Sequence, residues 1–234
     1  MVQAVRKRMP KIGTRKLYAV LQEQFAQTGI KVGRDGLFEV LRANQLLLKP
    51  KKRYIQTTNS KHWFHKYPNL IKGKQVERKE QVWVSDITYV RTEQGFCYLS
   101  MITDAYSRKI VGSAVSNSLS TELCSRALAE ALRGRNTIEK LIHHSDRGIQ
   151  YCSKEYVGML EDNGIEISMT ENGDPYENAL AERMNRTIKE EFFGDGKFND
   201  LRVLEMVAKE SVVIYNQERP HLSLGMQTPN EVHQ

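Results

Sequence analysis

Cysteine is scarce in this chain, and long apolar runs are absent from it. The 234 residues contain 3 cysteines, Cys97, Cys124 and Cys152, and no two of them have CxxC spacing. An odd, widely spaced set argues against a disulfide framework or a structural zinc site and favours reduced thiols in the cytosol. No apolar stretch approaches the roughly 18 residues that a membrane span needs, and the basic residues 1–13 lack the apolar run of a signal peptide.

Charge is distributed unevenly along the chain. The net charge is +7, but residues 1–80 carry 19 Lys and Arg against 5 Asp and Glu, whereas residues 81–234 carry 16 against 23. The balance is therefore +14 in the first part and −7 in the second. This asymmetry fits a polyanion-binding module joined to a body that gathers cations, and it also fits a merely solvated basic face.

Residues 1–48 predict a small helical segment. Apolar residues recur at helical spacing over 14–25 and again over 35–44, with a Thr-Gly break between the two patterns. Two short amphipathic helices with a basic exterior are compatible with a DNA-binding helix-turn-helix, and equally with a simple helical hairpin.

Residues 49–79 predict a basic, mostly extended linker. Lys51, Lys52 and Arg53 begin a run of bases that is suited to lie along a phosphate backbone. The interleaved aromatic residues, which are suited to stack on bases or to dock on the following domain, are Trp63, Phe64 and Tyr67.

From residue 81 onward the pattern changes to strands that alternate with helices. Apolar alternation and turn signals predict strands at 82–90, 96–103, 109–115, 138–143 and 165–169. Helical periodicity predicts helices at 121–133, 153–163, 175–193 and 201–217. This order implies an α/β fold in which residues 80–234 form a mixed sheet flanked by helices.

Three carboxylates in this region are candidates for catalysis. Asp86 lies on the first predicted strand, Asp146 follows the fourth, and Glu182 lies on the third helix, with 59 and 35 residues between them. Asp86 has apolar neighbours two and four residues away, and a lone carboxylate on a buried face costs several kcal/mol unless it is paired or metal-bound. Three converging carboxylates are what a protein needs to hold two divalent metals for phosphodiester chemistry.

Each carboxylate also fits a purely structural role. Asp86 fits a hydrogen bond to a core hydroxyl or arginine, Asp146 fits a turn, and Glu182 fits an exposed face with Glu–Arg pairs. The helix face of Glu182 is polar, which equally suits a metal beside a phosphate backbone. Its members are Asn178, Asn185, Arg186 and Lys189.

Together these features resemble the DDE motif of retroviral integrases and bacterial insertion-sequence transposases. The resemblance rests on the three carboxylates, the 35-residue gap before Glu182 and the base Lys189 seven places after it. It extends to the block WxxDxT at 83–88 and to the ending YNxxRPHxxLGxxTP at 215–229. Further matching blocks lie at 104–112, 144–151 and 178–182. In this order the blocks resemble the second reading frame of two-frame insertion sequences, over about residues 10 to 232.

The resemblance implies a ribonuclease-H-like fold and a transposase that catalyses metal-dependent DNA cleavage and strand transfer. Asp86, Asp146 and Glu182 would be its catalytic residues and would bind two Mg²⁺ or Mn²⁺ ions. Near this site the expected DNA contacts are Lys189 and Asn178, with Arg183 and Arg186 on the same helix. The expected DNA contacts of the linker are Lys51, Lys52 and Arg53.

The resemblance also implies partners and a location. Transposon ends, target DNA, further copies of the chain on that DNA and a first-reading-frame protein are expected, at the nucleoid in the bacterial cytoplasm. The zinc domain of retroviral integrases is absent, and helical sequence that usually precedes Pro10 in the family is nearly missing. A truncated copy that binds DNA and regulates transposition therefore remains an alternative, and a ribonuclease-H-type nuclease is a third interpretation.

Asp104 competes with Asp86 for the role of the first carboxylate. It ends the second predicted strand, and its block at 104–112 matches the family well. Asp86 is favoured because its alternating strand and its Trp and Thr flanks fit better. Asp104 is expected to be a turn residue beside Arg108.

Overall fold

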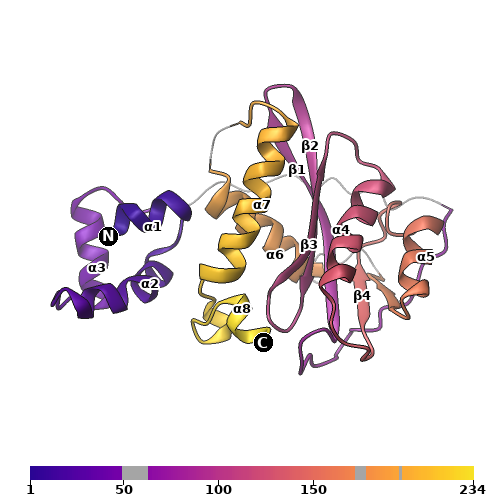
Figure 1. The fold of residues 1–234 in the computed structure, drawn as a ribbon, viewed down its shortest axis with the longest axis horizontal. Helices are drawn as coiled ribbons and strands as arrows, with labels where there is room; N and C mark the ends of the chain where they lie inside the picture. The colour runs from indigo at the N-terminus through magenta and orange to yellow at the C-terminus, as the bar shows by residue number, and fades with distance from the viewer. Residues whose placement is uncertain (49–62, 172–177, 195–196) are drawn as a thin grey trace.

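A five-stranded mixed sheet forms the centre of the structure, a computed structural model that describes residues 1–48, 63–171, 178–194 and 197–234 (Figure 1). Strands β1, β2 and β3 are antiparallel neighbours, whereas β4 and β5 run parallel to β1. In the spatial order β3-β2-β1-β4-β5, the strands are Ile110–Ser116, Gly95–Asp104, Val82–Thr92, Ile142–Ser145 and Glu166–Met169. The predicted fold class is confirmed.

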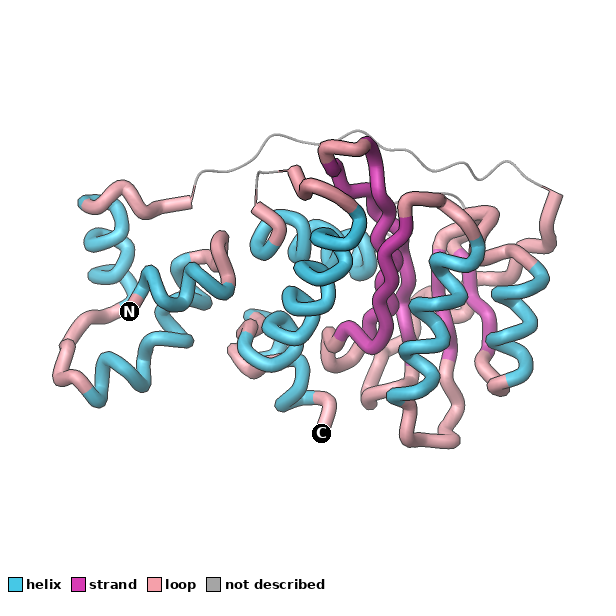
Figure 2. Tube along the Cα trace, turned by 45° about the horizontal axis from the view of Figure 1, so that its top comes forward, coloured by secondary structure: helices cyan, strands magenta, loops and turns pink. Residues whose placement is uncertain are grey.

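Helices cover the sheet on both faces, as Figures 1 and 2 show. α4 and α5 pack on each other and on β2, β3 and β5, whereas α6 packs on β1 and β2 and α7 packs on β3. α6 continues directly into the π-helical turn η2. The bounds are α4 Thr121–Gly134, α5 Lys154–Asp162, α6 Ala179–Thr187, η2 Ile188–Phe192, α7 Leu201–Glu218, η3 Leu222–Leu224 and α8 Pro229–Val232.

The alternation along β1 assigns its side chains to two opposite cores. Trp83 belongs to the apolar cluster of α4 and α5, whereas Val84 clusters with Ala181 of α6. Because successive side chains of a strand point to opposite faces, the even-numbered residues of β1 face α6. Asp86 is therefore directed toward the helix that carries Glu182.

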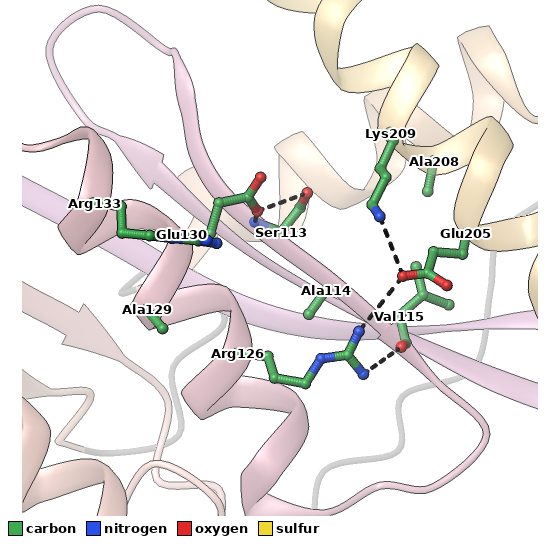
Figure 3. Close-up of a pocket in the computed structure, with 10 residues that line it drawn as sticks. All are labelled: Ser113, Ala114, Val115, Arg126, Ala129, Glu130, Arg133, Glu205, Ala208 and Lys209. Atoms are coloured by element: carbon green, nitrogen blue, oxygen red, sulfur yellow. Dashed lines mark hydrogen bonds and ion pairs between the residues drawn. The ribbon is translucent and has the colours of Figure 1, made fainter.

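The outer edge of β3 is capped by side chains of α4, as Figure 3 shows. The backbone N–H of Ser113 donates to Oε2 of Glu130 at 2.6 Å, and the guanidinium of Arg126 donates to the carbonyl of Val115 at 3.3 Å. Arg126 also pairs with Glu205 of α7 at 3.5 Å. These side chains occupy hydrogen-bonding groups that would otherwise invite another strand to pair with this edge.

The N-terminal segment contains three helices, α1 Val2–Arg8, α2 Thr14–Gln27 and α3 Arg34–Ala43. The two predicted helices are confirmed, and α1 is an addition. Their buried apolar side chains belong to the same continuous cluster as those of α6, η2 and α7. Polar contacts also join the parts: Lys16 pairs with Glu191 at 2.9 Å, the N–H of Lys11 donates to the carbonyl of Glu191 at 3.1 Å, and Arg8 pairs with Glu218 of α7.

The fourth predicted strand differs from the structure at both ends. β4 spans Ile142–Ser145 rather than 138–143, and Ile138 is fully exposed in the preceding loop. The described part of the helix predicted at 175–193 begins at Ala179, and its predicted start lies outside the described residues. Residues 63–79 of the predicted linker contain no helix or strand.

The three cysteines are buried free thiols in the structure, in agreement with the expectation from their spacing. Across the described ranges, no helix combines the length and the apolar character needed to cross a membrane.

Candidate active site

The register of β1 and β4 brings two of the candidate carboxylates together. The strands are parallel neighbours, and their last paired residues are Ser85 and Ser145. Asp86 and Asp146 each follow directly, so both emerge at the same point of the sheet. Both side chains line one cavity of about 620 Å³.

A hydrogen bond holds α6 against this point. The Nδ2 group of Asn185 donates to Oδ2 of Asp86 at 2.8 Å, and the backbone N–H of Ile87 donates to Oδ1 at 2.9 Å. Glu182 lies one helical turn before Asn185 and is exposed. Glu182 does not line the cavity of the two aspartates. It lies near them because α6, the helix that carries it, packs on β1.

The three carboxylates repel one another. The pKa of Asp86 is raised to about 7: burial contributes most and the negative charges of Asp146 and Glu182 add to it, whereas the hydrogen bonds from Asn185 and Ile87 oppose it. Burial also raises the pKa of Glu182, which Arg186 lowers and Asp146 raises. A site at which several carboxylates disfavour each other's ionisation is stabilised by a bound cation.

The donor chemistry fits a hard divalent cation. Asp86, Asp146 and Glu182 offer only carboxylate oxygens, which are the ligands that Mg²⁺ and Mn²⁺ prefer. Within the described ranges, no group of three or more His, Cys, Asp or Glu side chains forms a ready-made metal site. The fit therefore rests on the donor set and on the mutual repulsion of the carboxylates.

In EDTA, the variant Asp86→Asn is expected to be more stable than the original protein at pH of about 8, with a gain that shrinks toward pH of about 5. The folded chain holds a proton on Asp86 up to pH of about 7, whereas the ordinary pKa is 3.8. The stability linked to that proton is lost as the pH rises between these two values. A neutral amide avoids this loss. Thermal unfolding across this pH range measures the difference, and parallel curves for the two proteins would contradict the assignment.

The expected DNA contacts occupy different environments. Arg183 and Arg186 are exposed beside Glu182. Lys189 is half-buried, and its Nζ donates to Oγ1 of Thr88 at 3.2 Å and to the carbonyl of Tyr89 at 2.9 Å. Contact with DNA by these three residues stays a prediction.

Asn178 has a local structural contact. Its side chain is buried, and its Nδ2 donates to the carbonyl of Ser85 at 3.0 Å. This bond ties the start of α6 to β1 next to Asp86. The remaining predicted contacts, Lys51, Lys52 and Arg53, lie outside the described residues.

Asp104 has the environment of a turn residue. Its side chain is fully buried, and it accepts the backbone N–H groups of Glu80 at 2.6 Å and Ser107 at 2.8 Å. The Ser107 hydroxyl donates to it as well, at 2.8 Å. These bonds use its carboxylate to close the turn between β2 and β3, which supports the preference for Asp86.

Two buried residues of the site were not identified from the sequence as site residues. Asn185 orients Asp86, and its position three residues after Glu182 was the available signal. Tyr151 is among the residues that line the cavity, and its hydroxyl is 3.0 Å from the hydroxyl of Ser85. Tyr151 therefore links the segment after Asp146 to the residue that precedes Asp86.

Comparison with known sequences agrees with this architecture. The Integrase core domain family matches residues 76–175 and again residues 163–229. The insertion element IS600 uncharacterized 31 kDa protein of Shigella sonnei is 38% identical over 222 residues, which cover 93% of this chain and 82% of that protein. The transposase for insertion sequence element IS629 of Shigella sonnei is 32% identical, with 94% and 72% covered. The transposase for IS904 of Lactococcus lactis is 30% identical, with 87% and 81% covered.

Solved structures share the fold at low sequence identity. The HTLV-2 integrase catalytic core domain in complex with magnesium has a TM-score of 0.52 and 18% identity, and the match covers 67% of this chain and 98% of that one. The simian T-cell lymphotropic virus intasome in complex with PP2A regulatory subunit B56 gamma has a TM-score of 0.56 and 16% identity, with 94% and 74% covered.

The sheet and these matches define the class as an integrase-type polynucleotidyl transferase with a ribonuclease-H-like core. Within that class, the chain belongs to the insertion-sequence transposases, and its function is that of a DDE transposase. The predicted family, fold and enzyme class are thereby confirmed.

Proposed function

We propose that Asp86, Asp146 and Glu182 are the catalytic residues of this transposase and hold two Mg²⁺ or Mn²⁺ ions. The observation that carries the proposal is the β1–β4 register, which places Asp86 beside Asp146 while Asn185 holds the helix of Glu182 against them. Integrase-type DDE domains are metal-dependent, and the two-ion count is part of the proposal. When bound, such ions polarise the scissile phosphate and stabilise the leaving oxygen.

The protein's own groups supply orientation and charge. Asn185 and the N–H of Ile87 fix the two oxygens of Asp86, and the N–H of Gly148 fixes Oδ1 of Asp146 at 2.9 Å. Arg183 and Arg186 lie exposed beside Glu182, where their charges favour the approach of a phosphate backbone. In the reaction, a 3′-hydroxyl at the transposon end forms a bond to a target phosphate as a bond in the target strand breaks.

The partners and the organisation belong to the same proposal. Residues 1–48 would bind transposon-end DNA, residues 49–79 would track its backbone through Lys51, Lys52 and Arg53, and residues 80–234 would carry the chemistry. Joining two ends calls for more than one copy on the DNA. The similar retroviral structures include an intasome and trimeric and dimeric core forms. A first-reading-frame protein and a nucleoid location complete the proposal.

A strand-transfer assay tests the function. The purified chain is incubated with labelled DNA that carries the flanking ends of its own element, with Mg²⁺, with Mn²⁺ or with EDTA. Joined product is expected with either metal and not with EDTA, because the carboxylates repel one another without a cation. If DNA is bound but not joined even after the first-frame protein is added, a regulatory DNA-binding role replaces catalysis. Degradation of the RNA strand of a hybrid would instead indicate a nuclease.

A further inference from the structure

Strand β1 continues past the end of its neighbour β4. β4 pairs only with Val82–Ser85, whereas β1 runs on to Thr92. Over residues 86–90, the edge of β1 on that side has no strand partner among the described residues. Near the far end, Thr92 is bridged to Phe198. The cavity of about 620 Å³ lies along this open stretch, and Asp86 and Asp146 are part of its lining.

An aromatic surface forms the other part of that lining. Tyr89 pairs with Tyr98, and Arg91 pairs with Phe96, across β1 and β2, so the four side chains share one face of the hairpin. The rings of Tyr89 and Phe96 meet edge to face, with centroids 5.6 Å apart. Phe96 is 50% exposed although it is a large apolar side chain. The surface formed by Tyr89, Arg91, Phe96 and Tyr98 is called the aromatic shelf below.

Positive charge accompanies the aromatic shelf. The guanidinium of Arg91 lies 5.5 Å from the centroid of the Phe96 ring, and Nζ of Lys189 lies 4.8 Å from that of Tyr89. Exposed aromatic rings beside cations are the combination by which proteins bind unpaired nucleotides, since bases stack on the rings and phosphates pair with the cations. The volume of the cavity lies within the range of small-molecule sites, which suits one nucleotide.

We propose that the aromatic shelf binds one unpaired nucleobase of the DNA strand whose phosphate lies at Asp86 and Asp146. Phe96 and Tyr89 stack on the base, and Arg91 neutralises an adjacent phosphate. Tyr89 and Arg91 lie on the opposite face of β1 from Asp86, but one cavity is lined by all three and joins them around the open edge of the strand. The shelf can therefore hold the strand near the reacting phosphate after the base has left the helix. The inference rests on the proposed function, because it assumes that DNA reaches these aspartates.

Binding in EDTA tests the shelf without chemistry. Anisotropy measures the affinity of the full chain for a 12-nucleotide oligo(dT) and for a strand of equal length built from tetrahydrofuran abasic units. Phe96→Ala is expected to weaken oligo(dT) binding roughly 5- to 150-fold, the range for one stacked base. The same variant should leave affinity for the abasic strand unchanged, which also shows that it is folded. Phe96→Trp should restore the preference for bases.

Tyr106→Ala is the matched control. Tyr106 is an exposed aromatic residue in the turn between β2 and β3, outside the shelf, and its loss should leave both affinities unchanged. If Phe96→Ala binds oligo(dT) as tightly as the original protein does, the proposal is overturned. The same conclusion follows if Phe96→Ala weakens both strands equally, because the base would then play no part.

Strand transfer identifies which strand occupies the shelf. A single abasic unit is placed next to the transferred 3′ end or, in a second substrate, next to the joint in the target. If an abasic unit at one of these positions slows joining by the original protein but not by Phe96→Ala, the strand that carries it is the one bound by the aromatic shelf. The binding experiment needs no joined product. If the protein does not catalyse joining, a measured preference for oligo(dT) over the abasic strand therefore still supports the aromatic shelf. If the protein joins DNA but shows no preference for bases in the binding or the strand-transfer experiment, the proposed role of the aromatic shelf is wrong and the proposed function still holds.

Discussion

Glu182→Gln is expected to abolish strand transfer while DNA affinity changes little. Glu182 is exposed on α6, so an amide of the same shape costs almost no packing. Buried Asn178 and Asn185, on either side of it, keep the helix docked on β1. The variant lacks one of the three carboxylates that are proposed to hold the metal ions. Loss of one such preorganised group reduces turnover by about 10²- to 10³-fold, and loss of a metal ligand is expected to reach at least that.

The measurement is the initial rate of joining, with DNA affinity determined on the same preparations. Glu210→Gln is the matched control, since Glu210 is an exposed glutamate on α7. It removes the same charge from the chain and should join DNA at the original rate. Joining by Glu182→Gln at a rate near that of the original protein would remove this residue from the catalytic set. Equal losses in both variants would point to overall charge rather than to the site.

Arg219→Met is expected to destabilise the fold by about 3–5 kcal/mol, the usual cost of breaking a buried ion pair from one side. Arg219 is only 4% exposed, and its Nε and Nη2 groups donate to the two oxygens of Glu191 at 2.8 Å each. Its Nη1 lies 2.8 Å from Nε2 of His221. Burial raises the pKa of Glu191, but the pairs with Arg219 and Lys16 outweigh burial and leave this pKa lowered. Methionine keeps an unbranched apolar stem like that of arginine and removes the charge.

Urea unfolding measures this loss, and Arg8→Met is its control. Arg8 pairs with Glu218 at the surface, and exposed pairs contribute about 0–1 kcal/mol. The double variant Arg219→Met with Glu191→Leu should recover part of the stability, because the buried carboxylate that has lost its two bonds from Arg219 is replaced by an apolar side chain. A loss below about 1 kcal/mol in Arg219→Met would mean that the pair contributes no more than a surface pair does.

Local pattern was enough to predict the strand that carries Asp86, because apolar alternation reports burial directly. Asp86 and Asp146 are brought together by the β1–β4 register, which pairs residues about sixty positions apart. This register cannot be recognised from the local sequence pattern of either strand. The role of Asn185 was equally hidden. Its spacing placed it on the face of Glu182, but only the packing of α6 on β1 turns that spacing into a hydrogen bond with Asp86.

The misplaced end of β4 has a clear physical reason. His143, His144 and Ser145 are polar, so the pattern predicted that the strand ends where they begin. In the fold all three are buried. His143 contacts the hydroxyl of Tyr156 at 2.9 Å, and His144 contacts that of Ser168 at 2.8 Å. Burial lowers the pKa of His143 to about 3, so it is a neutral residue of the interior. Satisfied polar groups of this kind cannot be told from surface residues by hydropathy.

The single apolar cluster that runs from α1–α3 into η2 and α7 bears on how such proteins evolve. A segment can be exchanged between proteins when it has a hydrophobic core of its own and folds without its neighbour. Here Glu191, nine residues along the same continuous helix from Glu182, also anchors Lys16 of the N-terminal segment. New specificity is therefore expected to arise by substitutions on the outer surfaces of α2 and α3 rather than by shuffling of whole segments, because a transplanted segment would have to match a foreign interior.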